Sequence, residues 1–178
     1  ITEDELKSNF KDEIQALADE EKVEYDDIIG ILRSRYDGYR FSKNEERIYN
    51  PFSLCNAFRA KELGDYWFES GTPTFLVHLF ESNYFNIPDL EGNVEVTFKE
   101  MENYRINYKN IAPLLFQTGY LTIKEYLKDV NSYVLGFPNN EVRYAFLNCL
   151  FWEHTQLPTG TFSVDRFQDL IQERDIEG

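Results

Sequence analysis

The sequence predicts a mainly helical α+β protein, with a helical first part and a winged-helix-like second part. Apolar residues recur at helical spacing through most of residues 1–36. A break at Asp37-Gly38 followed by a polar turn predicts a short hairpin, and alternating residues between 120 and 137 predict a second one. With 178 residues, the chain has room for one large domain or two small ones.

The first segment, residues 3–20, is predicted to be one amphipathic helix. Thr2 followed by Glu5 forms a capping-box pattern, and apolar residues follow it at helical spacing. A second helix is expected over 25–36. Asp37-Gly38 ends it, because glycine tolerates the left-handed backbone conformation found at helix ends.

Two short segments, 39–42 and 47–49, flank a polar turn and predict a hairpin. Asn50-Pro51 is a helix start, with Asn as the N-cap and Pro at the first helical position, and this helix is expected to run to about Lys61. Thr72-Pro73 repeats the pair and predicts another helix.

The second half has the order helix, strand, turn, strand, helix, which is the plan of a winged-helix unit. We expect a helix over 110–117, strands over 120–126 and 133–137, and a helix opened by residues 138–141. A final short helix is expected over 163–173.

Residues 83–108 carry the weakest pattern, with Pro88, Gly92 and scattered aromatic residues. They predict a connection with a short strand or helix. We place a domain boundary near residue 90. Residues 1–90 then form the helical subdomain with its hairpin, and residues 91–178 form the winged-helix-like subdomain and the terminal helix.

Composition narrows the possible partners. The chain has 18 lysines and arginines against 32 aspartates and glutamates, a formal net charge of −14. Such a surface repels phosphate backbones, so direct nucleic-acid binding is disfavoured. No run approaches the roughly 18 apolar residues of a membrane span, and we expect a cytoplasmic protein. Cys55 and Cys149 lack metal or redox spacing and are expected to be buried thiols.

Motifs of common catalytic sites are missing from the sequence. There is no G-x-x-x-x-G-K-[ST] phosphate loop. A PD-(D/E)XK nuclease needs an Asp and a Glu-x-Lys on adjacent strands, whereas Glu21-Lys22 sits at a helix end. His78 and His154 are isolated, which argues against zinc. We therefore predict no catalytic residue, no metal ligand and no cofactor in this chain, which is not expected to be an enzyme.

DNA reading in a winged-helix unit would fall to the helix at 110–117. Its only polar side chains are Asn110 and Gln117, whereas a helix that reads a DNA groove needs several on its exposed face. We expect this helix to be buried in protein.

The most specific pattern is a set of five stretches. They are 36–42 (YDGYRFS), 49–53 (YNPFS), 66–73 (YWFESGTP), 115–124 (within LLFQTGYLTIK, which begins at Leu114) and 135–142 (LGFPNNEV). Together they resemble the AAA-ATPase-like family of bacterial and archaeal proteins, whose members often end in a PD-(D/E)XK-type nuclease domain. The resemblance covers roughly residues 1–155.

This resemblance implies a lid-like helical subdomain and a winged-helix-like subdomain from a P-loop ATPase. The chain would be a non-catalytic regulatory or mechanical segment. Its partners would be a missing N-terminal ATPase core and a possible C-terminal nuclease domain, and ATP and Mg²⁺ would belong to the parent protein only. The alternative is a protein-interaction module without nucleotide contact, which docks a partner through exposed aromatics such as Phe151 or Trp152.

The resemblance also nominates Arg40 as a nucleotide-sensing residue oriented by Asp37, because the lid of AAA-type proteins often lends an arginine to the nucleotide phosphates. A sensor should be partly exposed in this chain. The other interpretation is structural: a buried and paired Arg40 would make the pattern a folding motif. Structural roles are expected for Tyr36, Gly38, Tyr39, Phe41, Asn50, Pro51, Trp67, Ser70 and Gly71. One aromatic cluster is expected from Tyr36, Tyr39, Tyr49, Trp67 and Phe68.

Overall fold

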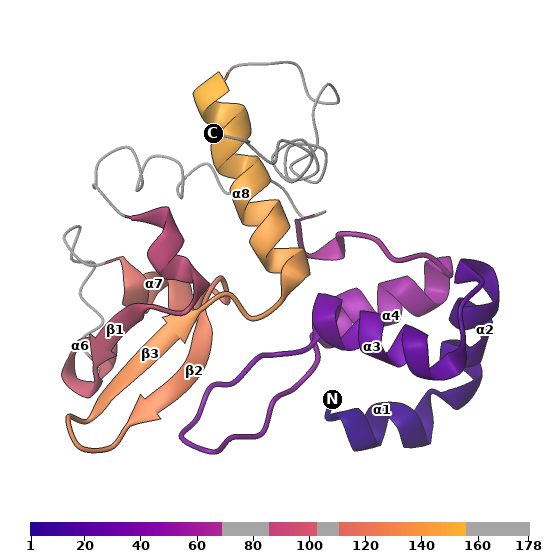
Figure 1. Ribbon diagram of the computed structural model, residues 1–178, viewed down its shortest axis with the longest axis horizontal. Coiled ribbons are helices and arrows are strands. Elements are labelled where there is room, and N and C mark those ends of the chain that lie inside the picture. Colours follow the sequence, from indigo (N-terminus) through magenta and orange to yellow (C-terminus); the bar gives the residue numbers. More distant parts are fainter. Residues whose placement is uncertain (69–85, 103–110, 156–178) are drawn as a thin grey trace, which may run out of the picture.

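The computed structural model describes residues 1–68, 86–102 and 111–155. The side chains of Phe68 and of residues 151–155 fall outside this description. So do Ser70, Gly71 and the helices predicted at Thr72-Pro73 and at 163–173. Within the described ranges, four helices precede a three-stranded antiparallel sheet that other helices flank, which confirms the mainly helical α+β class (Figure 1).

The first part of the chain is helical. It contains α1 (Glu3–Asn9), α2 (Lys11–Glu21), α3 (Tyr25–Tyr36) and α4 (Pro51–Ala60), followed by the short 3₁₀ turn η1 (Tyr66–Phe68). We call the apolar centre of this part the helical core. Its buried residues are Leu6, Ile14, Leu17, Ala18, Ile28, Ile29, Leu32, Tyr36, Tyr49, Leu54, Ala57 and Tyr66.

The predicted single helix over 3–20 is wrong, because the chain breaks at Phe10. The capping box at its start is present: Thr2 Oγ1 accepts from the Glu5 N–H, and the Glu5 carboxylate accepts from the Thr2 N–H. Phe10 leaves helical geometry, with φ −125° and ψ 30°, and its ring stacks on Phe58 of α4 at 5.6 Å between centroids. Apolar residues keep their helical spacing across the break. The sequence pattern therefore could not reveal that the chain changes direction at Phe10.

Asn50 begins α4 as predicted. Its side-chain oxygen accepts from the N–H groups of Phe52 and Ser53, and Pro51 occupies the first turn. The expected hairpin before it is only partly formed, because a single antiparallel bridge, Tyr39 with Ile48, closes the loop. Figure 1 shows this loop leaving α3 and reaching toward the sheet before it returns to α4.

The second part is built on a sheet of strand order β1-β3-β2, with β1 (Val94–Thr97), β2 (Thr122–Leu127) and β3 (Ser132–Gly136) antiparallel to their neighbours. Around it lie η2 (Ile87–Glu91), α6 (Phe98–Glu102), α7 (Ala112–Gln117) and α8 (Asn140–Thr155). The β2–β3 hairpin forms the predicted wing. β1 is the short strand within the region of weak sequence pattern.

We call the apolar centre of this part the sheet core. Its buried residues are Tyr39, Leu90, Val94, Val96, Ile111, Ala112, Leu115, Tyr120, Leu121, Ile123, Tyr133, Leu135, Phe137, Val142, Phe146 and Leu150. α7 packs on it through Ala112 and Leu115, while Gln117 is exposed, so the predicted burial of this helix is confirmed on its apolar face. The boundary near residue 90 stays a prediction, although Leu90 already belongs to the sheet core.

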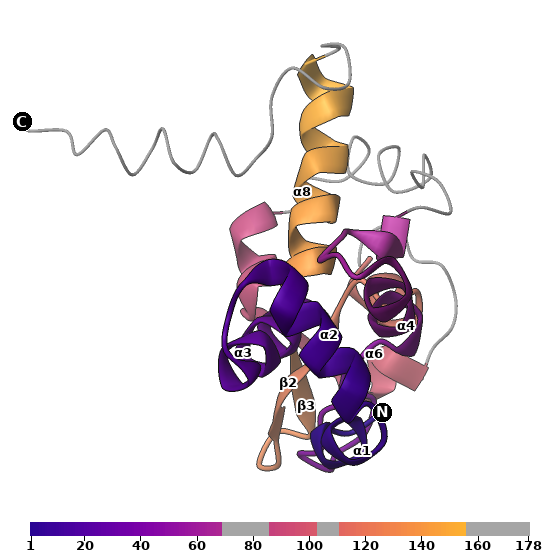
Figure 2. The same cartoon turned by 90° about the vertical axis from the view of Figure 1, so that its right-hand side faces the viewer.

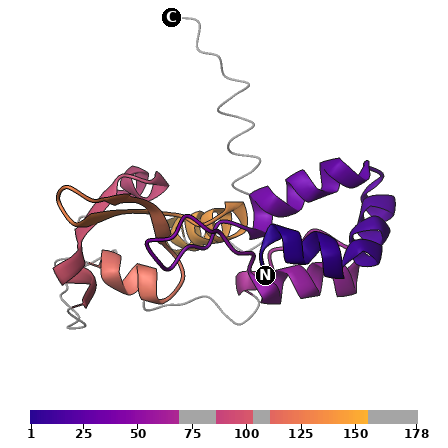
Figure 3. The same ribbon diagram turned by 90° about the horizontal axis from the view of Figure 1, so that it is seen from below.

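The two parts lie side by side, and α8 starts between them and extends away (Figures 2 and 3). None of the helices in the described ranges is long and apolar enough to cross a membrane. Cys149 is buried as predicted, but Cys55 is exposed. The buried face of α4 consists of Ser53, Leu54 and Ala57, and Cys55 falls off that face.

We expect Asn50→Ala to lower the free energy of unfolding by about 1 kcal/mol, because two N–H groups of α4 lose their acceptor. Urea denaturation would measure the loss. Asn44→Ala in the exposed loop is the control and should change stability by less than about 0.5 kcal/mol. Equal losses in the two variants would contradict the capping role.

Candidate functional site

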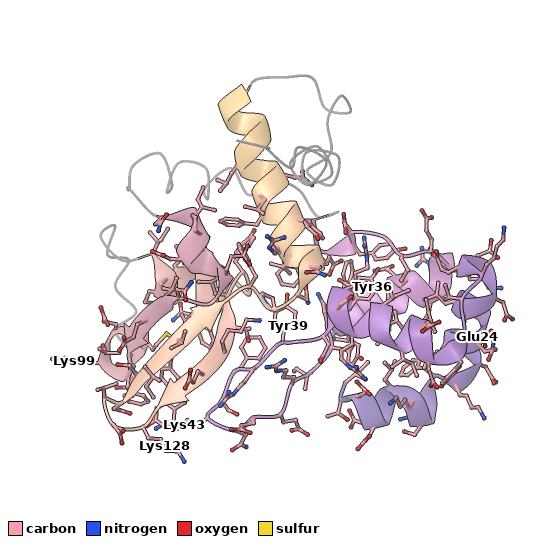
Figure 4. All side chains as sticks on the ribbon, viewed as in Figure 1. Glu24, Tyr36, Tyr39, Lys43, Lys99 and Lys128 are labelled. Atoms are coloured by element: carbon pink, nitrogen blue, oxygen red, sulfur yellow. The ribbon has the colours of Figure 1, made fainter. Side chains whose placement is uncertain are left out.

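The described parts of the segments that carry the sequence pattern come together where the helical and sheet parts meet. Figure 4 labels Tyr36 at the end of α3 and Tyr39 three residues on, at the start of the loop that faces the sheet. Stretch 36–42 runs between the two cores, and stretches 115–124 and 135–142 approach it from the sheet part. We call this region the junction. Stretches of the pattern that are far apart in the sequence are therefore neighbours in the fold.

Arg40 is the best-connected residue of the junction. Its N–H donates to Thr122 Oγ1 at 2.6 Å, and its carbonyl accepts from that hydroxyl at 2.9 Å and from the Ile123 N–H at 3.1 Å. Its guanidinium donates to the carbonyls of Ser42, Lys43 and Lys124. Only 8% of the residue is exposed.

This geometry is the one that the structural interpretation of Arg40 requires. A sensor-like arginine should have an exposed guanidinium, but carbonyl oxygens of the chain surround this one. Asp37 does not orient it either, since no hydrogen bond joins the two side chains in the described part of the chain. The nomination of Asp37 and Arg40 as a nucleotide-sensing pair therefore has no geometric support in this conformation.

Asp37 and Gly38 instead contact the segment before α8. The Asp37 carbonyl accepts from Asn139 Nδ2 at 3.0 Å. Gly38 has φ +102°, and a Cβ built on it would lie 2.1 Å from the Pro138 carbonyl oxygen. Any side chain here would be strained and would collide with backbone, so the glycine permits both the turn and the close approach. Burial raises the pKa of Asp37, and the Gly38 N–H partly offsets this.

Glu141 closes the junction on its other side. It is fully buried, and its carboxylate accepts from the Trp67 N–H at 2.9 Å. The second carboxylate oxygen has no partner within the described structure. Burial raises the pKa of Glu141 above its ordinary value, because desolvation disfavours the charged form.

The predicted single aromatic cluster is wrong. Tyr36 and Tyr49 lie in the helical core, where the Tyr36 hydroxyl donates to the Gly64 carbonyl at 2.8 Å. Tyr39 and Trp67 belong with the sheet core, and their rings are 5.9 Å apart. α3 ends at Tyr36, Asp37 is extended and Gly38 has a positive φ, so rings three positions apart enter different cores. The Phe68 side chain lies outside the description.

Two further members of the pattern complete the sheet side of the junction. Phe41 is 54% exposed, yet its ring stacks on Tyr39 at 5.7 Å between centroids. Gly119 has φ +81°, and a Cβ there would lie 2.9 Å from the Trp67 ring. The glycine lets the turn before β2 pass close to the indole.

A cavity of about 430 Å³ lies beside the junction. Its walls come from α3, the loop after it, η2, β2 and the start of α8. Gly38, Pro138 and Asn139 connect it to the contacts described above. The charged side chains that line it are Arg33, Asp37, Arg47, Glu91, Lys124 and Arg143.

Two of these cations have carboxylate partners. Arg33 binds Glu3 through two nitrogens at 2.6 and 2.7 Å, and together with Lys7 it lowers the pKa of Glu3 to about 2. Arg143 binds Glu91 at 2.6 Å. Lys124 donates only a long contact of 3.4 Å, to the Pro138 carbonyl, and burial together with the charge of Arg47 lowers its pKa.

Sequence reasoning did not find this cavity. Its cations are far apart along the chain and belong to four different elements, so no spacing rule links them. In the described ranges, no group of three or more His, Cys, Asp or Glu side chains could hold a metal ion. His78 and the His154 side chain lie outside those ranges.

Comparison with known proteins identifies a longer relative. No family model and no solved structure matches the chain. A protein of Azotobacter chroococcum mcd 1, described as "Uncharacterized protein in vnfD 5'region", is 32% identical over 151 residues. The match covers 83% of this chain and 28% of that protein, so the chain spans less than a third of the relative's length. The family resemblance inferred from the motifs stays a prediction.

We expect Thr122→Val to lower the free energy of unfolding by about 1–3 kcal/mol, because the buried Arg40 N–H loses its acceptor while the side-chain shape is kept. Thr118→Val is the matched control, since that hydroxyl bonds only carbonyls of its own helix. Denaturant titration of both variants measures the difference. A loss no larger than that of the control would show that the junction does not depend on this pair.

We expect Glu141→Gln to flatten the pH dependence of stability. A carboxyl whose pKa is raised on folding binds a proton more tightly in the native state, so its contribution falls as pH rises. The free energy of unfolding of the unsubstituted protein, minus that of Glu141→Gln, should therefore decrease from about pH 4 upward. Unfolding at several pH values measures it, and an opposite slope would contradict the direction of the shift.

Proposed function

We propose that this chain is a non-catalytic connecting segment of a larger P-loop, AAA-ATPase-like protein, where it has a regulatory or mechanical role. One observation carries the proposal: the described parts of the stretches that resemble the family meet at the junction, where hydrogen bonds join them between two hydrophobic cores. Residues with such contacts fix the relative orientation of two parts. They do not form a nucleophile, a general base or a phosphate loop.

The polar contacts of the junction favour a fixed orientation. Thr122 with Arg40, Asn139 with Asp37, and Glu141 with Trp67 each join segments more than 70 residues apart. Buried polar groups are costly to leave without partners, so sliding of one part over the other is disfavoured. A segment of this kind transmits a movement from a neighbouring domain to what lies beyond it.

The length of the relative supports a larger parent protein, because the matching region is 28% of that chain. In this proposal the ATPase core precedes the segment and a nuclease domain follows it where one is present. ATP and Mg²⁺ bind the parent's core. Arg40 contributes by holding the junction closed and not by touching nucleotide.

The second candidate is a protein-interaction module. Phe52 at the start of α4 is 54% exposed, as is Phe41, and exposed aromatic rings are common anchors in protein interfaces. Phe151 and Trp152, which the sequence suggested for this role, have side chains outside the described structure. The two candidates differ in whether the junction or the exposed rings govern the activity of the parent protein.

The test uses the parent protein with Thr122→Val in one variant and Phe52→Ser in another. If the segment couples domains, we expect Thr122→Val to lower ATP turnover several-fold while ATP binding is kept, and Phe52→Ser to leave turnover unchanged. Residues 1–178 alone should hydrolyse no ATP. Phosphate release and nucleotide binding are measured at a temperature where all variants are folded.

Two outcomes would overturn the proposal. A parent protein that neither binds nor hydrolyses ATP would remove the ATPase resemblance. A Thr122→Val variant with normal turnover but measurably lower stability would show that the junction supports folding without coupling. Loss of partner binding in Phe52→Ser alone would favour the interaction module.

A further inference from the structure

We propose that the cavity beside the junction binds a small phosphate-bearing anion through Arg47 and Lys124. This site is separate from the connecting role above and does not depend on whether the parent protein hydrolyses ATP. The ligand class is a free di- or triphosphate group, alone or on a small organic molecule. The charges and the shape of the cavity favour this class of ligand.

The charge of the cavity favours an anion. Four cations and two carboxylates line the cavity, an excess of two positive charges on a chain whose formal net charge is −14. Cations on so acidic a protein are normally distributed among carboxylates. Here they converge on one concave site, which raises the local concentration of small anions.

Two of the four cations that line the cavity have no ion pair in the described structure. Glu3 and Glu91 occupy Arg33 and Arg143, so Arg47 and Lys124 remain. The described structure gives Arg47 no hydrogen bond or ion pair, and Lys124 has only the long contact to a carbonyl. Lys124 is half-buried, and its pKa is lowered by desolvation and by the charge of Arg47, which the carboxylates of Glu91 and Asp37 offset only in part. The attraction of a bound anion would offset both the cost of desolvation and the repulsion between the two cations.

The start of a helix also borders the cavity. α8 begins at Asn140, which lines the cavity, and α8 is 16 residues long. The N-terminal end of a helix carries partial positive charge and N–H groups that favour phosphate oxygens. The Val142 N–H at this end already donates to Asn139 Oδ1 and the Arg143 N–H to the Asn139 carbonyl. The start of α8 therefore contributes its partial positive charge to the space that Lys124 lines.

The volume of the cavity indicates the size of its occupant. A volume of about 430 Å³ falls within the range of roughly 300–1,000 Å³ that is typical of small-molecule sites. This volume is larger than a single inorganic ion requires, and it can hold a diphosphate. A nucleic-acid backbone would have to approach across the acidic surface, which opposes it. The occupant is therefore a small molecule.

The test titrates residues 1–178 with inorganic pyrophosphate by calorimetry at constant ionic strength. We expect saturable binding of one pyrophosphate per chain. Arg47→Gln and Lys124→Met should each weaken it about tenfold or more, because each removes a charge-assisted contact. Arg59→Gln, an exposed arginine of α4, and Lys128→Met are the matched controls and should leave affinity unchanged. Figure 4 places Lys128 at the far end of the β2–β3 hairpin.

Two readouts keep the test decisive if a variant is destabilised. Thermal unfolding of each variant shows whether it is folded at the titration temperature, and Arg47→Gln removes no hydrogen bond that the described structure contains. NMR titration of the Lys124 side chain should show its pKa rising when pyrophosphate is present. Absence of saturable binding up to about 10 mM, equal weakening in the controls, or an unchanged Lys124 titration would overturn the proposal.

Discussion

The arrangement of the two parts depends on the paired hydrogen bonds between Arg40 and Thr122. The chain leaves α3 and runs between two apolar cores, where its backbone groups are shielded from water. A buried N–H or C=O without a partner is strongly unfavourable. The Thr122 hydroxyl accepts from the Arg40 N–H and donates to its carbonyl, and the Ile123 N–H adds a second donor to that carbonyl. Without these partners the segment could not follow this path.

The same contacts explain the form of the loop after Tyr39. The Arg40 guanidinium donates to two carbonyls of the loop and to one of β2, which attaches the loop to the edge of the sheet. Lys43 then lies over the Tyr126 ring at 4.4 Å and its ammonium donates to the Tyr126 hydroxyl. The arginine therefore replaces the missing strand pairs of the hairpin, and only one bridge is needed to close it.

The junction also creates the charged cavity beside it. Gly38 lets the helical part approach Pro138 closely, and this brings the face of α3 opposite β2 and the start of α8. Lys124 is thereby desolvated without a carboxylate partner. One close packing contact thus gives the segment both its fixed shape, on which the proposed coupling role rests, and the positively charged space proposed to bind phosphate.

Local sequence signals determined what depends on neighbouring residues: the Thr2 capping box, the Asn50-Pro51 helix start and the β2–β3 hairpin. Tertiary structure alone decided the break at Phe10, the exposure of Cys55 and the entry of Tyr36 and Tyr39 into different cores. It also decided the burial and carbonyl pairing of Arg40 and the gathering of cations into the cavity. Periodicity and spacing report which residues share a face of one element, but contacts across 80 residues, such as Arg40 with Thr122, determine what that face meets.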